Sequence, residues 1–161
     1  MKLNQLFIVI NGNDERLFKK DSNKTVICKE ENKYFQQDCT LLQTDFKSLE
    51  DLVKARQLIK KQSSPINEII LINKDIDLNM ISYQYNYEYI KNNYSILSNL
   101  IYFINLLISD FDKNLNFIFA FEKDSHYKVH VNIFNNSINN YLDRLKDDLK
   151  KSHSIIIKIL N

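Results

Sequence analysis

The residues with the clearest capacity for chemistry are two histidines, His126 and His130, in the segment FAFEKDSHYKVHVNIF. On a helix, a spacing of four residues would bring both imidazoles together, as in the zinc-binding H-E-x-x-H motif. Here Tyr127 stands where that motif has glutamate, and the alternation of apolar and polar residues favours a β-strand. On a strand the two histidines lie about 13 Å apart, too far to share one metal ion. The sequence therefore predicts no metal site here.

A small metal-dependent nuclease is an alternative that the sequence leaves open. Residues Glu31 to Lys33 read Glu-x-Lys, half of such a site, and Asp21 could supply an upstream carboxylate. A chain rich in lysine and glutamate contains this tripeptide by chance, so the pattern carries little weight.

Cysteine chemistry is a further possibility. Cys28 or Cys39 could pair with His130 or His153 as thiol and imidazole. No neighbouring residue activates either thiol, and the spacing of the two cysteines does not match a zinc site with four Cys or His ligands. We therefore predict no catalytic residue and no enzymatic activity.

The glycine content restricts the possible functions most strongly, because the chain contains a single glycine, Gly12. Loops that cradle phosphates need several residues that adopt positive φ or allow a ligand close to the backbone. A Walker loop or a dinucleotide fingerprint cannot be written with one glycine. The sequence therefore predicts no nucleotide cofactor and argues against ATPase, GTPase and NAD-dependent activities.

Composition indicates one folded domain over residues 1–161, with 44% hydrophobic and 26% charged residues. The 22 basic and 20 acidic residues leave a net charge of +2, without the basic excess typical of nucleic-acid binding. The apolar run Leu6 to Ile10 is shorter than a signal-peptide core. The most apolar stretch, residues 96–109, falls short of a membrane span. We therefore expect a cytoplasmic protein without a membrane partner.

Hydrophobic periodicity predicts strands and helices in a single α+β domain that opens with a set of antiparallel strands. Strands are expected at 5–11, 24–30, 34–43, 67–73, 114–122, 127–134 and 154–160, and helices at 45–62, 95–111 and 135–152. Segments 114–122 and 127–134 are interpreted as a hairpin, which predicts a mostly antiparallel sheet with about three helices. The apolar helix at 95–111 is expected to be central and buried, with Leu100, Phe103, Ile104 and Leu107 in the core.

A run of tyrosines is the most distinctive candidate for a binding surface. Tyr83, Tyr85, Tyr87 and Tyr89 alternate with polar residues, which favours a strand over a helix. Tyrosine is enriched at the centres of protein interfaces, so we predict that these four residues bind a partner protein. The alternative is that the tyrosines form the inner face of a sheet.

The closing pattern resembles that of bacterial immunity proteins, which neutralise toxins of contact-dependent and other polymorphic systems. It consists of the strand pair NFIFAFEKDSHYKVHVNIF, the helix YLDRLKDDLKK and the strand SIIIKIL. The resemblance implies a non-enzymatic cytoplasmic inhibitor that binds a cognate toxin domain, with no cofactor. A structural or accessory subunit of phage type is a further alternative.

Overall fold

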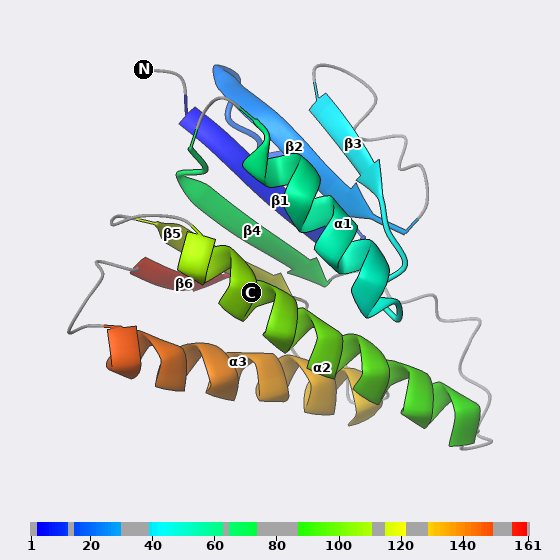
Figure 1. Ribbon diagram of the computed structural model, residues 1–161. Coiled ribbons are helices and arrows are strands. Elements are labelled where there is room, and N and C mark those ends of the chain that lie inside the picture. Colours follow the sequence, from blue (N-terminus) through cyan, green and yellow to red (C-terminus); the bar gives the residue numbers. More distant parts are fainter. Residues whose placement is uncertain are drawn as a thin grey trace.

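The computed structural model describes residues 3–12, 15–29, 39–62, 65–73, 87–110, 115–121, 129–149 and 156–160. Its centre is a six-stranded sheet in the order β3-β2-β1-β4-β5-β6 (Figure 1). The strands are β1 (Leu3–Asn11), β2 (Ser22–Cys28), β3 (Cys39–Gln43), β4 (Glu68–Asn73), β5 (Asn116–Phe121) and β6 (Ile156–Leu160). The described helices are α1 (Leu49–Lys60), α2 (Tyr87–Asp110), α3 (Val129–Leu149) and the short 3-10 helix η1 (Glu15–Leu17).

Every pair of neighbouring strands in this sheet is parallel, so the predicted mostly antiparallel α+β fold is wrong. Most of the predicted strand segments exist, but they pair through crossovers instead of hairpins. The sequence signal for this arrangement is β4, EIILIN, which is buried at every position. A strand covered on both faces has a continuous apolar run instead of an alternating one, and such strands are typical of parallel sheets.

The predicted second strand of the hairpin, 127–134, is also wrong, because residues 129–134 form the start of α3. Ile133, an apolar residue in that predicted strand, is 49% exposed, whereas its neighbour Phe134 is 8% exposed. Phe134, Ile138 and Leu142 are buried at helical spacing. Because these buried residues follow helical spacing, helical periodicity prevails over the short alternating pattern.

The three α-helices cover one face of the sheet (Figure 1). The connections β3–α1–β4, β4–α2–β5 and β5–α3–β6 all cross the sheet in the same direction. Right-handed crossovers in one direction place their helices on one face. The resulting core joins strand residues to helix residues, among them Leu6, Ile8, Ile69, Leu71, Phe117, Phe119, Leu52, Ile59, Leu100, Phe103, Ile104, Leu107, Ile138 and Leu142.

The opposite face of the sheet carries a second apolar cluster. Its buried residues are Phe7, Val9, Val26, Cys28, Ile70, Ile72, Ile118 and Ala120. Leu17 and Phe18, from the connection between β1 and β2, pack against this cluster. The rings of Phe7 and Phe18 meet edge to face with centroids 5.0 Å apart. Residues of the β1–β2 connection therefore help to cover the face opposite the α-helices.

Helix α2 lies on the surface of the sheet and is not a central helix buried on all sides, as the sequence had predicted. The four predicted core residues, Leu100, Phe103, Ile104 and Leu107, are fully buried. Tyr94 and Tyr102, on the same helix, are exposed. Among the described helices, none is long and apolar enough to cross a membrane.

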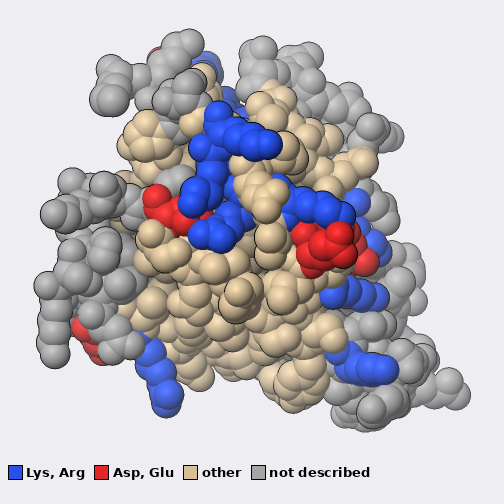
Figure 2. Space-filling view, in the orientation of Figure 1, with Lys and Arg blue, Asp and Glu red and all other residues tan. Residues whose placement is uncertain are grey.

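Polar contacts fix the helices to one another. The Asp110 carboxylate at the end of α2 receives two hydrogen bonds from the Arg56 guanidinium and one from Lys60 Nζ, at 3.1 Å. Both basic residues belong to α1, where Figure 2 shows positive and negative side chains close together. On α3, the Tyr141 hydroxyl donates to Asn105 Oδ1 of α2 at 2.7 Å. Burial raises the pKa of Tyr141 to about 12, so this phenol remains a donor at neutral pH.

The hydrogen bonds of Asp110 with Arg56 and Lys60 make the free energy of unfolding depend on pH in the acid range. The hydrogen bonds from Arg56 are the largest cause that holds the pKa of Asp110 below its usual value, and Lys60 adds to it. A lowered pKa in the folded state stabilises the protein above the unfolded pKa, about 3.9, and this stability is lost as pH falls through the folded value. Asp110→Asn should lower the free energy of unfolding at pH 7 by about 1.5–3 kcal/mol. Urea unfolding should also show a smaller loss of stability between pH 7 and pH 2 for this variant than for the wild type.

Glu50→Gln is the matched control, because the Glu50–Lys54 pair on α1 is fully solvent-exposed. Its unfolding curves should follow those of the wild type closely at pH 7. Equal acid sensitivity of Asp110→Asn and the wild type would contradict the assignment.

The packing of α2 predicts a large difference between its two sides. Leu107→Ala leaves a cavity in the core and should destabilise the fold by about 2–5 kcal/mol. Tyr94→Ala, on the exposed side of the same helix, should change stability by less than about 1 kcal/mol. Chemical denaturation of the two variants measures both values, and a small effect of Leu107→Ala would show that this stripe does not face the sheet.

Candidate functional site

The carboxyl ends of all six parallel strands lie along one edge of the sheet. From β1 the chain proceeds outward to β2 and β3, and then returns to β4 on the other side of β1. The strand order therefore reverses between β1 and β4. In open parallel sheets, ligands bind outside the carboxyl ends of the strands at such a reversal. The ends of β1 and β4 are thus the first place to look for a site.

The end of β1 departs from regular strand geometry. The pairing register with β4 shifts between Val9 and Asn11, and Asn11 is paired with Asn73, the last residue of β4. Gly12 follows with φ of 77°, a left-handed conformation that glycine adopts without a steric penalty. Irregularities of this kind redirect a chain and frequently occur beside functional sites.

A cluster of buried asparagines lies where β4 meets α3. Asn73 Nδ2 donates to Asn135 Oδ1 at 2.8 Å, and both residues are buried. The other amide atom of Asn135, Nδ2, is buried without a hydrogen-bond partner. One turn further along α3, Asn139 Oδ1 is also buried without a partner. The cluster therefore holds one unused donor and one unused acceptor.

Buried unpaired atoms of this kind reduce the stability of the fold, so their presence calls for an explanation. A buried polar group without a partner costs about 1–3 kcal/mol, and native proteins contain few of them. Because Asn135 and Asn139 are four residues apart on a helix, their side chains lie on the same side of α3. Together they can bind a polar group that both accepts and donates a hydrogen bond. We designate Asn73, Asn135 and Asn139 the asparagine cluster.

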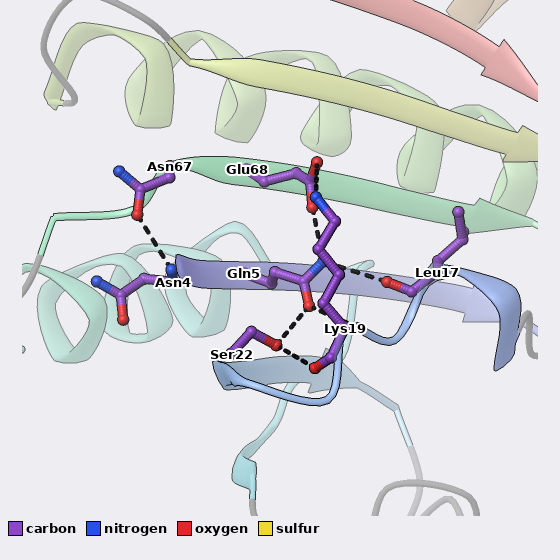
Figure 3. Close-up of polar contacts among 7 residues, drawn as sticks. All are labelled: Asn4, Gln5, Leu17, Lys19, Ser22, Asn67 and Glu68. Carbon is purple, nitrogen blue, oxygen red and sulfur yellow. Dashed lines mark hydrogen bonds and ion pairs between the residues drawn. The ribbon is translucent and has the colours of Figure 1, made fainter. Parts of the chain in front are cut away.

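The amino ends of the strands carry a second polar cluster, which is fully paired (Figure 3). Gln5 Nε2 donates to Glu68 Oε2 at 2.6 Å and to the Leu17 carbonyl at 3.1 Å. Gln5 Oε1 accepts from Ser22 Oγ at 2.7 Å, and Lys19 Nζ donates to Glu68 Oε1 at 3.1 Å. Beside it, Asn67 Oδ1 accepts from the Asn4 backbone amide at 3.0 Å. Since these side chains satisfy one another, this cluster is structural.

The tyrosines predicted to bind a partner fall only partly within the described residues. Tyr83 and Tyr85 lie outside them. Tyr87 and Tyr89 belong to the first turn of α2, so the strand interpretation is wrong for these two. Their predicted role in binding a partner protein stays a prediction.

The histidines and the nuclease residues gain no support from the structure. His130 lies in α3, so the strand geometry used to separate it from His126 does not hold there, and His126 is outside the described residues. Asp21 is exposed, and residues 31–33 of the Glu-x-Lys pattern lie outside the described part of the chain. Among the described residues there is no group of three possible metal ligands.

The cysteines are not brought together either. Strand pairing places Cys39 opposite Lys24 and Cys28 opposite Gln43, so the two thiols lie at opposite ends of the β2–β3 pair. His153, one of their proposed partners, is outside the described residues. A thiol–imidazole pair therefore has no support in the described structure.

Sequence reasoning missed the asparagine cluster altogether. The segment NNSINN on α3 contains four asparagines, which are poor helix formers, and two of them carry the unpaired atoms. That composition was the available signal. The pairing with Asn73 could not be seen, because it joins residues 62 positions apart.

Comparison with known proteins identifies the type of fold through solved structures. No protein-family model matches the chain, and no curated protein matches it. Solved structures do match. A short-chain dehydrogenase/reductase from Brucella melitensis has a TM-score of 0.73 at 12% identity, over 96% of this chain and 74% of that one. The chain has a Rossmann-like fold, similar to that of this short-chain dehydrogenase/reductase.

Two further structures agree. A short-chain dehydrogenase family protein from Francisella tularensis has a TM-score of 0.70 at 15% identity, over 94% of this chain. The present chain spans 65% of that protein. The 3-ketoacyl-(acyl-carrier-protein) reductase of Brucella melitensis, solved with NADH, has a TM-score of 0.68 at 10% identity, over 99% of this chain and 75% of that one. At these identities the likeness establishes the Rossmann-like fold alone.

These likenesses overturn the predicted function. The hypothesis of a non-enzymatic immunity protein that inhibits a toxin depended on an antiparallel α+β organisation, which this chain does not have. The similar solved chains named above are dehydrogenases and reductases, which are enzymes. Both the resemblance to immunity proteins and the prediction of no enzymatic activity are therefore wrong.

The unpaired acceptor of Asn139 leads to a stability prediction. Asn139→Leu removes a buried polar atom without a partner and should raise the free energy of unfolding by about 1–3 kcal/mol relative to its control. Asn140→Leu is that control, because Asn140 is exposed on the same helix and its replacement supplies the same gain in helix propensity. Urea unfolding compares the two variants, and equal stabilities would show that Asn139 Oδ1 is satisfied in solution.

Proposed function

We propose that this protein is an enzyme that binds a small, uncharged polar molecule at the carboxyl edge of its sheet, against the asparagine cluster. The observation that carries the proposal is the buried, unpaired donor of Asn135 beside the buried, unpaired acceptor of Asn139. A ligand that fills both positions would recover the free energy lost to the unpaired atoms. The location supports the proposal, because Asn73 ends a strand beside the point where the strand order reverses.

The chemistry of the cluster favours a neutral ligand. Asparagine amides carry no charge, so a buried ionic group would gain no counter-charge from these three residues, at a large cost in solvation. A carboxamide or a hydroxyl group both donates and accepts hydrogen bonds, which matches one free N–H and one free carbonyl oxygen. We therefore propose an amide or a polyol as the ligand class.

The asparagines bind and orient, and they neither take up nor release protons near neutral pH. Their part in a reaction would be to hold the substrate in one position, which alone lowers a reaction barrier considerably. Proton transfer would fall to groups other than this cluster.

A nicotinamide-dependent oxidoreductase is a second candidate. The Brucella reductase was solved with NADH, and a short-chain dehydrogenase from Burkholderia cenocepacia was solved with NADP. In this chain, Gly12 takes positive φ directly after β1, as a phosphate-binding turn requires. The rest of that turn does not fit a dinucleotide, because Asp14 and Leu17 stand where the fingerprint has its further glycines.

The experiment is to identify small molecules that the protein retains. Protein expressed in a bacterial cytosol and purified by rapid gel filtration is denatured, and the released compounds are measured by mass spectrometry. The wild type should carry a neutral amide or polyol that the double variant Asn135→Leu/Asn139→Leu lacks. A thermal-melt series with acetamide and with glycerol should likewise stabilise the wild type more than this variant.

The control is the double variant Asn136→Leu/Asn140→Leu, which changes two exposed asparagines of the same helix. It should retain the compound and respond to acetamide or glycerol as the wild type does. If all three proteins carry the same compounds and respond equally to both probes, the asparagine cluster is not the ligand site.

A further inference from the structure

The connection between β1 and β2 departs from the fold to which this chain is otherwise similar. In dinucleotide-binding sheets, the first strand leads through a glycine-rich turn into a helix, and the pyrophosphate lies at the amino end of that helix. Here residues 12–21 make the connection, and the helical structure described in it is η1, with three residues of 3-10 helix.

Chain length accounts for the missing α-helix. Ser22 pairs with Leu3, so the connection must return along most of β1, from Asn11 to the level of Leu3. That distance is eight residues of strand, or about 26 Å. Ten residues in an α-helix would span about 15 Å, whereas ten extended residues span about 33 Å. The connection can reach β2 only if it is largely extended.

Polar and apolar contacts hold this connection against the sheet. Leu17 and Phe18 pack on the apolar face opposite the α-helices. The Leu17 carbonyl accepts from Gln5, and the Lys19 ammonium pairs with Glu68, which is 3% exposed (Figure 3). Ser22 Oγ lies 2.7 Å from both the Lys19 carbonyl oxygen and Gln5 Oε1, and it can donate its one proton to either. Residues 15–22 therefore form a strap across the sheet.

The residue types along the turn also conflict with phosphate binding. If Gly12 is the first glycine of a G-x-G-x-x-G fingerprint, the second and third positions are Asp14 and Leu17. The second glycine lets the backbone approach the pyrophosphate and the third lets the helix pack closely on the strand. A carboxylate at the second position repels phosphate, and the Leu17 side chain packs on the sheet.

We infer that the strap replaces the phosphate-binding helix, and that the turn after β1 does not hold a dinucleotide. A three-residue 3-10 helix provides neither the row of free backbone amides nor the dipole that stabilises a pyrophosphate. The chain retains the sheet of the dehydrogenases without the element that binds their cofactor in that fold. This inference goes beyond the proposed function and does not depend on the asparagine cluster.

The test is calorimetric titration of the full chain with NADH and, separately, with NADPH, up to about 1 mM, which detects weak binding. The same titrations are made with the double variant Asn135→Leu/Asn139→Leu. We expect no saturable binding to the wild type.

Saturable binding of either dinucleotide to the wild type would overturn the inference, whether or not the double variant retains it, because Asn73 pairs with Asn11 beside the turn. This outcome is distinct from failure of the proposed function, which is read from the retained small molecules of the asparagine variants. A protein that binds neither dinucleotide and loses its retained compound in the double variant would support both conclusions.

Discussion

Parallel pairing of β1 with both β2 and β4 is the constraint on which the rest of this structure depends. Two parallel neighbours cannot be joined by tight turns, so each connection must return the chain to the amino edge of the sheet. Three of the connections do so with α-helices, which cross in one direction and cover one face. The β1–β2 connection is too short for a helix, and its extended strap contacts the other face. The two faces are therefore covered by different means.

The polar groups at the two edges of the sheet differ in whether their hydrogen-bonding atoms are paired. At the amino edge, the fully buried Gln5 uses its amide nitrogen and oxygen to bind the strap, Ser22 and Glu68, so the cluster holds the strap in place. At the carboxyl edge, Asn135 and Asn139 each keep one buried atom unpaired. A folded chain tolerates such a cost where another gain compensates for it, and ligand binding supplies one. The contrast separates a structural cluster from a candidate site.

The fold of this protein does not by itself determine its function. The chain is similar in structure to dehydrogenases at 10–15% identity and has the strand order of dinucleotide-binding sheets, yet the described part of its β1–β2 connection contains the three-residue helix η1 and no α-helix. A fold can host many functions, and function is argued from the site. In this chain the site evidence lies on α3 and β4, where Asn73 pairs with Asn11 beside the turn after β1.

The sequence by itself determined most of the local structure. The apolar runs of β1, β4 and β5 and the stripe of Leu100, Phe103, Ile104 and Leu107 identify strands and a core helix face, because these patterns depend on residues close in the chain. The single glycine likewise excludes a glycine-rich phosphate loop, because composition alone limits how many positions can take positive φ at no steric cost.

Only the tertiary structure decided how those elements pair and where polar atoms meet. The direction of strand pairing depends on crossovers between elements far apart in the chain, and local patterns indicate it only through continuous apolar runs such as that of β4. Helix 129–149 also overrode a short alternating pattern, because burying Phe134, Ile138 and Leu142 on one face required helical periodicity. The contact between Asn73 and Asn135 joins residues 62 positions apart. The unpaired atoms Asn135 Nδ2 and Asn139 Oδ1 can be identified only from the folded structure, because burial is what removes water from them.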